Sequence, residues 1–315
     1  MGFVGRAVVA LLFPGQGSQF VGMGRDLCAA HPVARATFAE ADNALGFPLS
    51  QLCADGPESD LTQTHNAQPA ILTHSIAVLR CVDDALGGVA CAAGHSLGEF
   101  SAWVAAGSMT FADGLRTVRR RGELMMRGGE ERTGTMAAVL GLEDEVVEAI
   151  CRDASTDGEV CVPANYNGPG QTVISGDSAA IDRAIASARG SGARRAIRLN
   201  VSGAFHSPLM KVAESGLAER LAQVQFADPR FPVVSNVTAQ PIRDPATARR
   251  LLTAQLTAPV RWTESMQAIV AMGIRRFVEV GPGTILTGLL RRIERDVESR
   301  GIGTAADIAA FVAAP

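Results

Sequence analysis

The sequence predicts an α/β protein built on a parallel β-sheet, with a smaller second unit inserted in the chain. Short apolar runs alternate with amphipathic stretches, which is the pattern of a parallel sheet covered by helices. Turn signals rich in glycine and proline separate these segments. Between residues 135 and 198 the order changes to strand, helix, two strands, helix and strand, which predicts the second unit.

The first half of the chain supplies the beginning of the parallel sheet. Residues 7–13 read as a buried strand, because the apolar run is short for a signal peptide and a Pro-Gly-Gln-Gly loop follows at once. A helix is predicted over residues 68–86, with Pro69 in its first turn. The small apolar residues 89–93 form the next strand, and a helix over residues 99–106 follows it.

The inserted unit has the element order β-α-β-β-α-β, which is the order of a ferredoxin-like domain. Its strands are expected over residues 136–140, 160–165, 171–176 and 194–199, and its helices over residues 143–153 and 178–190. We assign residues 131–199 to this small domain, and residues 1–130 and 200–315 to the large domain. Further strands of the large domain are expected over residues 231–236 and 276–280.

Composition and charge exclude several classes of protein. The chain has 315 residues, of which 47% are hydrophobic and 19% charged, and this argues against disorder and fibrous repeats. A net charge of −3 provides no basic field for nucleic acid, and no apolar run reaches the roughly 18 residues that a membrane span needs. The six cysteines include no C-x-x-C pair and read as thiols of a reducing compartment. We therefore expect a cytoplasmic protein without a nucleic-acid or membrane partner.

Residues 94–98, Gly-His-Ser-Leu-Gly, match the pattern G-x-S-x-G between a predicted strand and a predicted helix. The glycines permit a sharp turn, because side chains at these positions would obstruct it. The turn lifts the Ser96 hydroxyl out of the sheet and places the Leu97 N–H at a helix start, where it can face an oxyanion. Chance matches are common in a chain with 33 glycines, but a match in this context is not. Ser96 is therefore the candidate nucleophile.

A serine nucleophile needs a base, and His206 is the candidate among five histidines. It lies in a loop of small residues ending in proline, which suits a positioned imidazole; the alternative is an ordinary surface histidine. His95 adjoins Ser96 and should point away from it, packing under the turn. No acidic residue stands out as an orienter, and about a third of the chain follows His206, unlike the order in α/β-hydrolases. We expect a Ser96–His206 pair oriented by a neutral group such as a backbone carbonyl.

Two other segments carry possible chemistry. The loop 13–19 is neither a dinucleotide fingerprint nor a phosphate loop. A glycine loop at a strand end can lend a backbone N–H to an oxyanion hole; the alternative is a plain tight turn.

Residues 119–121 are three arginines on one helix, which usually form a solvated face. Successive residues point about 100° apart, so one of them can face inward and fork onto a substrate carboxylate. His95 and Glu99 have metal-ligand spacing without a third ligand, so no metal site is predicted.

Six sequence blocks occur in a fixed order along the chain. They are residues 13–19, 94–100, 121–122, 203–208, 255–262 and 279–283. Together they resemble the malonyl-CoA:acyl carrier protein transacylases of fatty acid and polyketide synthesis, over nearly the whole chain. The resemblance implies an α/β-hydrolase-like domain with an inserted ferredoxin-like domain, which agrees with the division above. It also implies a free-standing enzyme of either pathway.

The resemblance implies a ping-pong reaction through a covalent acyl-enzyme. Ser96 would take the malonyl group from malonyl-CoA, with His206 as its base, and pass it to the phosphopantetheine thiol of an acyl carrier protein. Gln255 matches the residue whose backbone carbonyl holds the histidine, which would supply the missing orienter. No bound cofactor or metal is implied, and we expect a monomer.

The resemblance also assigns the substrate-binding groups. The backbone N–H groups of Gln16 and Leu97 match the oxyanion hole, and Arg121 matches the arginine that pairs with the malonyl carboxylate. Phe205, directly before the histidine, goes with malonyl in modular relatives, because a bulky ring crowds an α-branch. Trp103 stands where relatives usually carry leucine, either filling a core or reshaping the channel, so a branched or non-standard extender unit stays open.

Two rival functions remain open at this point. A thioester hydrolase could use the same scaffold, although an editing enzyme for neutral acyl chains has no use for Arg121. A non-catalytic docking protein would need a broken dyad, whereas Ser96 and His206 are both present. The acidic carrier protein could meet a group of arginines in the small domain. These are Arg189, Arg194, Arg195 and Arg198.

Overall fold

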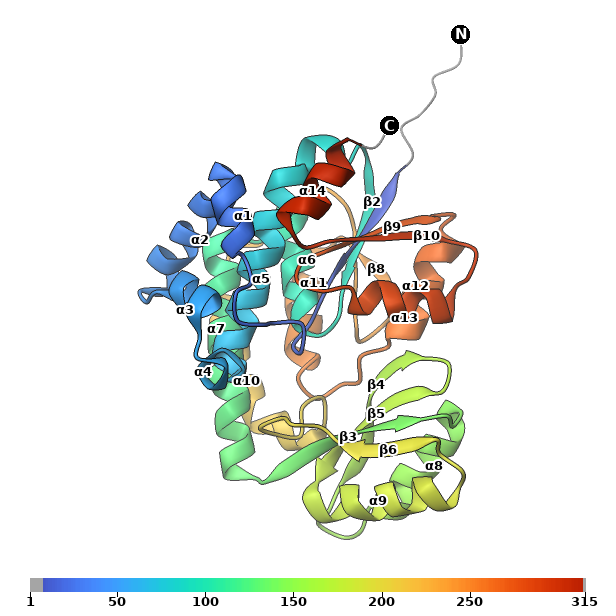
Figure 1. The fold of residues 1–315 in the computed structure, drawn as a ribbon. Coiled ribbons are helices and arrows are strands. Elements are labelled where there is room, and N and C mark those ends of the chain that lie inside the picture. The colour runs from blue at the N-terminus through green and yellow to red at the C-terminus, as the bar shows by residue number, and fades with distance from the viewer. Residues whose placement is uncertain (1–7, 314–315) are drawn as a thin grey trace.

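The computed structural model describes residues 8–313, which form two β-sheets and the helices around them (Figure 1). The larger sheet has the strand order β10-β9-β1-β2-β7-β8. Its strands are β1 (Val9–Phe13), β2 (Val89–Gly94), β7 (Val233–Val234), β8 (Pro241–Ile242), β9 (Arg276–Val280) and β10 (Glu298–Ile302). Neighbouring strands are parallel except for the pair β7–β8. The predicted parallel sheet is therefore present.

The second sheet is antiparallel and has the strand order β4-β5-β3-β6. Its strands are β3 (Gly134–Leu140), β4 (Cys161–Gly168), β5 (Gln171–Asp177) and β6 (Arg195–Arg198), with α8 (Asp144–Ala154) and α9 (Ser178–Gly190) between them. The predicted element order is thus observed. In Figure 1 both helices lie on the face of this sheet that is turned away from the larger sheet. The limits at residues 131 and 199 stay a prediction.

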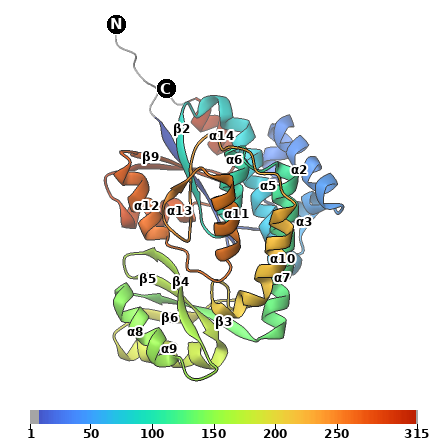
Figure 2. The same ribbon diagram turned by 180° about the vertical axis from the view of Figure 1, so that it is seen from behind.

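The remaining helices surround the larger sheet. They are α1 (Arg25–Ala30), α2 (Pro32–Leu45), α3 (Leu49–Asp55), α4 (Glu58–Leu61), α5 (Thr64–Val82), α6 (Leu97–Ala105), α7 (Phe111–Glu131), α10 (Lys211–Ala222), α11 (Pro245–Ala254), α12 (Trp262–Ala271), α13 (Ile285–Ile293) and α14 (Ala305–Val312), with short 3-10 turns at Asp83–Ala85 and Pro208–Met210. Figure 2 shows α10 beside α7 and α11 beside α10. No helix within residues 8–313 is both long and apolar enough to cross a bilayer.

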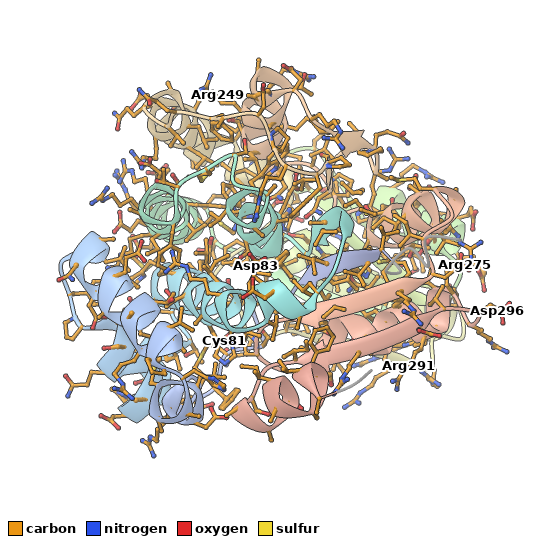
Figure 3. All side chains as sticks on the ribbon, turned by 90° about the horizontal axis from the view of Figure 1, so that it is seen from above. Cys81, Asp83, Arg249, Arg275, Arg291 and Asp296 are labelled. Carbon is orange, nitrogen blue, oxygen red and sulfur yellow. The ribbon has the colours of Figure 1, made fainter. Side chains whose placement is uncertain are left out.

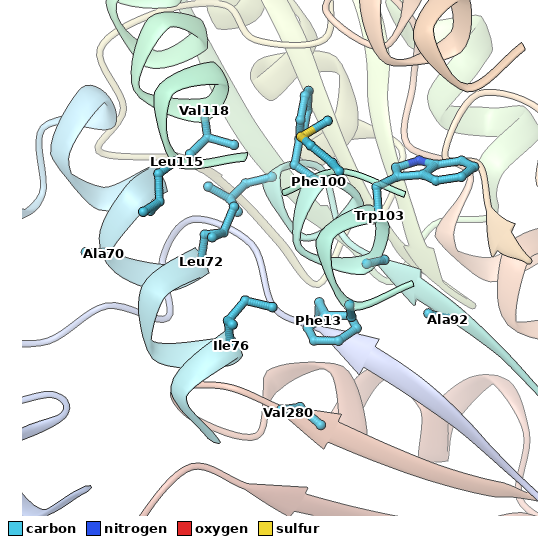
Figure 4. Close-up of a cluster of buried hydrophobic side chains, with 14 of the residues drawn as sticks. Phe13, Ala70, Leu72, Ile76, Ala92, Phe100, Trp103, Leu115, Val118 and Val280 are labelled. Carbon is cyan, nitrogen blue, oxygen red and sulfur yellow. The ribbon is translucent and has the colours of Figure 1, made fainter. Parts of the chain in front are cut away.

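Strand β1 is buried on both faces, which explains its unbroken apolar sequence. Leu11 and Phe13 belong to the core under α5, α6 and α7 (Figure 4). Ala10 and Leu12 belong to the core on the other face, with α12 and α13. By contrast, charged side chains such as those of Arg275, Arg291 and Asp296 lie exposed at the edge of the molecule (Figure 3).

The helix predicted over residues 68–86 starts too late, although helical turns continue to Ala85, close to the predicted end. The observed helix α5 begins at Thr64 and ends at Val82, so Pro69 lies inside it rather than in its first turn. Proline has no N–H to donate to the carbonyl of His65 one turn earlier. Arg119 Nη1 on α7 donates to that carbonyl instead, at 3.1 Å. A hydrogen bond from another helix thus allows Pro69 to lie inside α5, whereas the local sequence predicts it in the first turn of a helix.

Two strand predictions need smaller corrections. The strand expected over residues 231–236 pairs only at Val233–Val234, because the chain turns after two bonded residues to form the hairpin with β8. The first strand begins at Val9, and Ala7 lies outside the described residues. The strand over residues 276–280 and the helix over residues 178–190 agree with the prediction.

Candidate active site

Ser96 occupies the turn between β2 and α6, at the carboxyl end of a central parallel strand. Its φ of 51° is rare for a residue with a side chain. The glycines at positions 94 and 98 are required because neither position has room for a Cβ atom. A Cβ on Gly94 would lie 1.9 Å from the backbone of Gly98, and a Cβ on Gly98 would lie 2.0 Å from the carbonyl oxygen of Phe13. The Ser96 N–H donates to Asn236 Oδ1 at 2.7 Å, which holds the turn.

His206 lies against the serine hydroxyl. The distance from Ser96 Oγ to His206 Nε2 is 2.7 Å. On the other side of the ring, Nδ1 lies 2.8 Å from the carbonyl oxygen of Gln255 and 3.2 Å from that of Ala258. These acceptors keep the proton on Nδ1, so Nε2 is free to accept one. Burial, reinforced by the charge of Arg121, lowers the pKa of His206 to about 3, so the ring is neutral at neutral pH.

Arg121 is the one arginine of 119–121 that turns inward, and it is 1% exposed. Arg119 and Arg120 instead pair with Glu123 at the surface. Arg121 Nη2 donates to Ser96 Oγ at 3.1 Å. Burial lowers the pKa of Arg121 to about 10, so the group still carries its charge at neutral pH. The geometry places a fixed cation directly beside the candidate nucleophile.

Neutral oxygens hold the Arg121 guanidinium. Nη1 donates to Gln68 Oε1 at 2.8 Å, and Nη2 donates to Gln255 Oε1 at 2.9 Å. The face of the guanidinium also lies 5.4 Å from the centroid of the Phe100 ring. A guanidinium held by neutral groups keeps its charge available for an anionic ligand.

The loop after β1 packs against the serine turn. A Cβ on Gly15 would lie 2.5 Å from the carbonyl oxygen of His95, and a Cβ on Gly281 would lie 2.7 Å from Pro14. A side chain at Gly15 would collide with the backbone of the serine turn, and one at Gly281 would collide with the Pro14 ring, which explains the glycines of these blocks. Within residues 8–313, the N–H groups of Gln16 and Leu97 donate to no protein acceptor. Both residues line the cavity over Ser96.

A cavity of about 360 Å³ opens over Ser96, between the two sheets. Phe205 and Met125 line it from the side of the larger sheet, and Met136 and Asn165 line it from the smaller sheet. All the side chains and N–H groups predicted for the site line this cavity, except Gln255, which lies beneath it. A cavity of about 420 Å³ between α1, α2 and α3 contains none of them.

His95 packs beside the turn against Trp262 and Asn167, and it also lines the cavity over Ser96, which the prediction of a residue packed under the turn did not include. Its ring centroid lies 5.5 Å from that of Trp262, and its Nε2 lies 2.7 Å from Asn167 Oδ1 on β4. The same strand bonds to the chain near His206, since Val260 N–H donates to the carbonyl of Ala164 at 2.8 Å. The smaller sheet is therefore hydrogen-bonded to the serine turn and to the segment whose carbonyls hold the His206 ring.

Trp103 fills the core rather than the channel. Its side chain is fully buried on α6 (Figure 4), where its ring lies edge-on to Phe226 at 6.4 Å. It is not among the residues that line the cavity over Ser96. The four arginines expected to meet a carrier protein are all exposed. Arg198 pairs with Asp182 and Arg189 donates to the Ala196 carbonyl, whereas Arg194 and Arg195 have no such contact within residues 8–313.

Sequence reasoning missed four side-chain roles in the site. Gln68 and the Gln255 amide hold Arg121, Asn236 holds the serine turn, and Glu99 lies beneath them. Glu99 offered a signal, because a carboxylate in an otherwise apolar helix needs a partner. The others offered none, since their partners are distant in the chain.

Known proteins resemble this chain over almost its full length. The model of the acyl transferase domain family matches residues 10–310. The malonyl CoA-acyl carrier protein transacylase of Salmonella typhimurium is 46% identical over 285 residues, which are 90% of this chain and 92% of that protein.

Two solved structures have the same fold. The acyl carrier protein S-malonyltransferase of Vibrio cholerae superposes with a TM-score of 0.93 at 43% identity, covering 96% of this chain and 99% of that one. A malonyl-transacylase in complex with its type II PKS acyl-carrier protein gives a TM-score of 0.94 at 40% identity, covering 97% and 99%. Because sequence and fold agree over 90% of the chain or more, the chain belongs to the acyl transferase family and, within it, to the malonyl-CoA:acyl carrier protein transacylases.

Proposed function

We propose that this protein transfers a malonyl group from malonyl-CoA to the phosphopantetheine thiol of an acyl carrier protein, through an acyl-enzyme on Ser96. The observation that carries the proposal is the position of the Ser96 hydroxyl, 2.7 Å from His206 Nε2 and 3.1 Å from Arg121 Nη2. A nucleophile between a neutral base and a fixed cation suits a substrate that carries a carboxylate close to its thioester.

In the first half-reaction, Ser96 Oγ attacks the thioester carbonyl while His206 Nε2 takes the hydroxyl proton. The carbonyls of Gln255 and Ala258 accept hydrogen bonds from the Nδ1–H group and so stabilise the imidazolium that forms. The tetrahedral oxyanion is held by backbone N–H groups after β1 and at the start of α6. Coenzyme A then leaves with the proton from His206, and the carrier-protein thiol reverses these steps.

Arg121 selects the acyl group. The malonyl carboxylate replaces Ser96 Oγ as an acceptor of the guanidinium and fixes the thioester carbonyl over the nucleophile. Phe205 lines the same cavity, so its ring disfavours an α-branch, by about 1–3 kcal/mol for one methyl group. We therefore propose malonyl rather than a branched extender unit as the substrate.

Intact-protein mass spectrometry after mixing with malonyl-CoA tests the proposal. We expect a malonyl adduct that persists until a carrier-protein thiol is added and that is absent from Ser96→Ala. Rapid loss of the adduct to free malonate would identify a thioester hydrolase instead. If the protein forms no adduct at all, it is a non-catalytic docking protein.

Finer features belong to the same proposal. We assign the larger sheet and its helices, residues 1–130 and 200–315, to an α/β-hydrolase-like domain, and the antiparallel sheet, residues 131–199, to a ferredoxin-like insert. The strand order of the antiparallel sheet supports this assignment. We propose a cytoplasmic monomer without a bound cofactor, and its six free cysteines support a reducing compartment. The acidic carrier protein would approach the exposed Arg194 and Arg195.

A further inference from the structure

Glu99 is a buried carboxylate for which the proposed mechanism has no use. It lies on α6, three residues after the nucleophile, and it is 1% exposed. It is not among the residues that line the cavity over Ser96. Burial of a carboxylate is unfavourable unless its oxygens are well satisfied, so its retention at this place needs a reason.

Both hydrogen bonds of Glu99 converge on one oxygen. Oε2 accepts from Gln255 Nε2 at 2.6 Å and from the Asn236 N–H at 3.0 Å. Burial raises the pKa of Glu99 to about 7, against the opposing effect of these two hydrogen bonds and of the Arg121 charge.

Three acceptors on the nitrogen side determine which way the Gln255 amide points. Its Nε2 donates to Glu99 Oε2 at 2.6 Å, to the Ser96 carbonyl at 3.1 Å and to Asn236 Oδ1 at 3.3 Å, and Glu99 is the nearest of the three and the only charged one. An amide side chain has an accepting oxygen at one end and a donating nitrogen at the other. Because the acceptor Glu99 lies on the nitrogen side, the oxygen of Gln255 faces Arg121 Nη2, at 2.9 Å. If the amide flipped, its nitrogen would face the donor Arg121 and its oxygen would face a carboxylate.

We propose that Glu99 is a positioning residue for malonyl recognition: it orients the Gln255 amide, whose oxygen holds Arg121 beside Ser96. The inference rests on the proposed function, in which Arg121 binds the malonyl carboxylate. Glu99 contacts no substrate atom and acts only through Gln255. The carboxylate therefore contributes to the choice between diacid and simple acyl groups.

Acylation by malonyl-CoA and by acetyl-CoA separates this role from a structural one. Glu99→Ala removes the nearest and only charged acceptor of the Gln255 amide and leaves two longer, neutral ones. We therefore expect kcat/KM for malonyl-CoA to fall about tenfold through a higher KM, while acetyl transfer changes little. Glu99→Gln is the conservative variant. Its Oε1 can accept both N–H groups from the same place, so we expect most of the malonyl preference to be retained.

Asn167→Ala is the matched control. Asn167 Oδ1 lies 2.7 Å from Nε2 of His95, the neighbour of the nucleophile, so this change disturbs the serine turn through a residue that forms no hydrogen bond with Gln255 or Arg121. It should lower malonyl and acetyl transfer alike. If Glu99→Ala also lowers both alike, or neither, the positioning role is wrong. If Glu99→Gln loses the preference as fully as Glu99→Ala, the charge of Glu99 matters rather than its orienting hydrogen bonds, and the proposal again fails.

Gln255→Met completes the test and covers the case in which Glu99→Ala does not fold. It keeps the backbone carbonyl that holds His206 and removes the amide. We expect the same selective loss of malonyl transfer, and no further loss of preference when Glu99→Ala is added. An unchanged malonyl preference in Gln255→Met would contradict the inference. Arg121→Ala separates the two proposals: if it keeps the malonyl preference, the proposed role of Arg121 fails first.

Discussion

Ser96 and His206 are 110 residues apart in the chain, yet both have left-handed backbone conformations, with φ of 51° and 56°, and their side chains meet at 2.7 Å. Such conformations cost about 1–3 kcal/mol each for residues with a side chain, and they persist where surrounding contacts impose them. Asn236 holds the backbone of Ser96, and the carbonyls of Gln255 and Ala258 hold the imidazole of His206.

This strain predicts the effect of substitutions at the nucleophile. Ser96→Gly and Ser96→Ala both remove the hydroxyl, so neither should form an acyl-enzyme. Glycine tolerates the φ of 51° without strain, so we expect Ser96→Gly to be about 1 kcal/mol more stable than Ser96→Ala. Denaturant unfolding of the two variants measures this difference. A more stable Ser96→Ala would show that the turn is relaxed.

Arg121 should control the choice of acyl group. In Arg121→Ala we expect kcat/KM for malonyl-CoA to fall about 100-fold, because a bidentate charge-assisted contact is lost, with acetyl transfer unchanged or improved. Arg120→Ala is the matched control, since Arg120 lies on the same helix but faces Glu123 at the surface. Steady-state kinetics with both thioesters give the comparison. Equal losses for the two substrates would argue against carboxylate binding.

The cavity wall should set the tolerance for branched substrates. Phe205→Ser removes a ring from the cavity lining, so we expect methylmalonyl-CoA to gain about 1–3 kcal/mol relative to malonyl-CoA. Competition between the two thioesters, with the adducts read by mass, measures the ratio. Trp103→Leu serves as the contrast: it should lower stability by leaving a core cavity and leave the ratio unchanged. A changed ratio in Trp103→Leu would place that residue in the channel.

The depressed pKa of His206 predicts an unusual pH dependence. Since burial and Arg121 lower the pKa from 6.5 to about 3, the base stays neutral, and single-turnover acylation should show no histidine titration between about pH 7 and about pH 5. Folding stability behaves differently. The unfolded chain binds the proton near pH 6.5, so the contribution of neutral His206 is complete above that pH and is lost as pH falls toward 3.

Buried His74, whose pKa burial lowers to about 4, adds to this acid sensitivity. Denaturant titrations across the range measure the loss of stability. A sigmoidal fall in the acylation rate centred near pH 6.5 that persists in Glu99→Gln, which removes the buried carboxyl with a pKa of about 7, would contradict the neutral, buried imidazole of the structure.

The exposed arginines of the smaller sheet should matter only in the second half-reaction. Arg194→Glu together with Arg195→Glu should raise KM for the carrier protein at low salt, because charge complementarity is reversed. Formation of the acyl-enzyme from malonyl-CoA should not change. Arg183→Glu is a suitable control, since Arg183 binds Glu159 and the Ala154 carbonyl on another part of the same unit. Unchanged transfer to the carrier protein would remove this surface from the proposal.

Local sequence patterns were sufficient for a large part of the architecture. The strand–turn–helix around Ser96 follows from apolar periodicity and from two glycines that lie within four residues of each other. The order of elements in the smaller sheet follows from the same periodicity, and one helix, Ser178–Gly190, agrees to the residue. These features depend on neighbours in the chain, which a single sequence displays directly.

The sequence by itself thus determined the nature of the sheet, the sharp turn and the side chains able to do the chemistry. Only the tertiary structure decided how those side chains are held. The Gln255 amide reaches Glu99 across 156 residues, and Arg121 meets Gln68 across 53. Pro69 is tolerated inside a helix because a distant arginine replaces the lost hydrogen bond. Amide orientation and burial arise from partners that no local pattern encodes, because they become neighbours only when the chain packs.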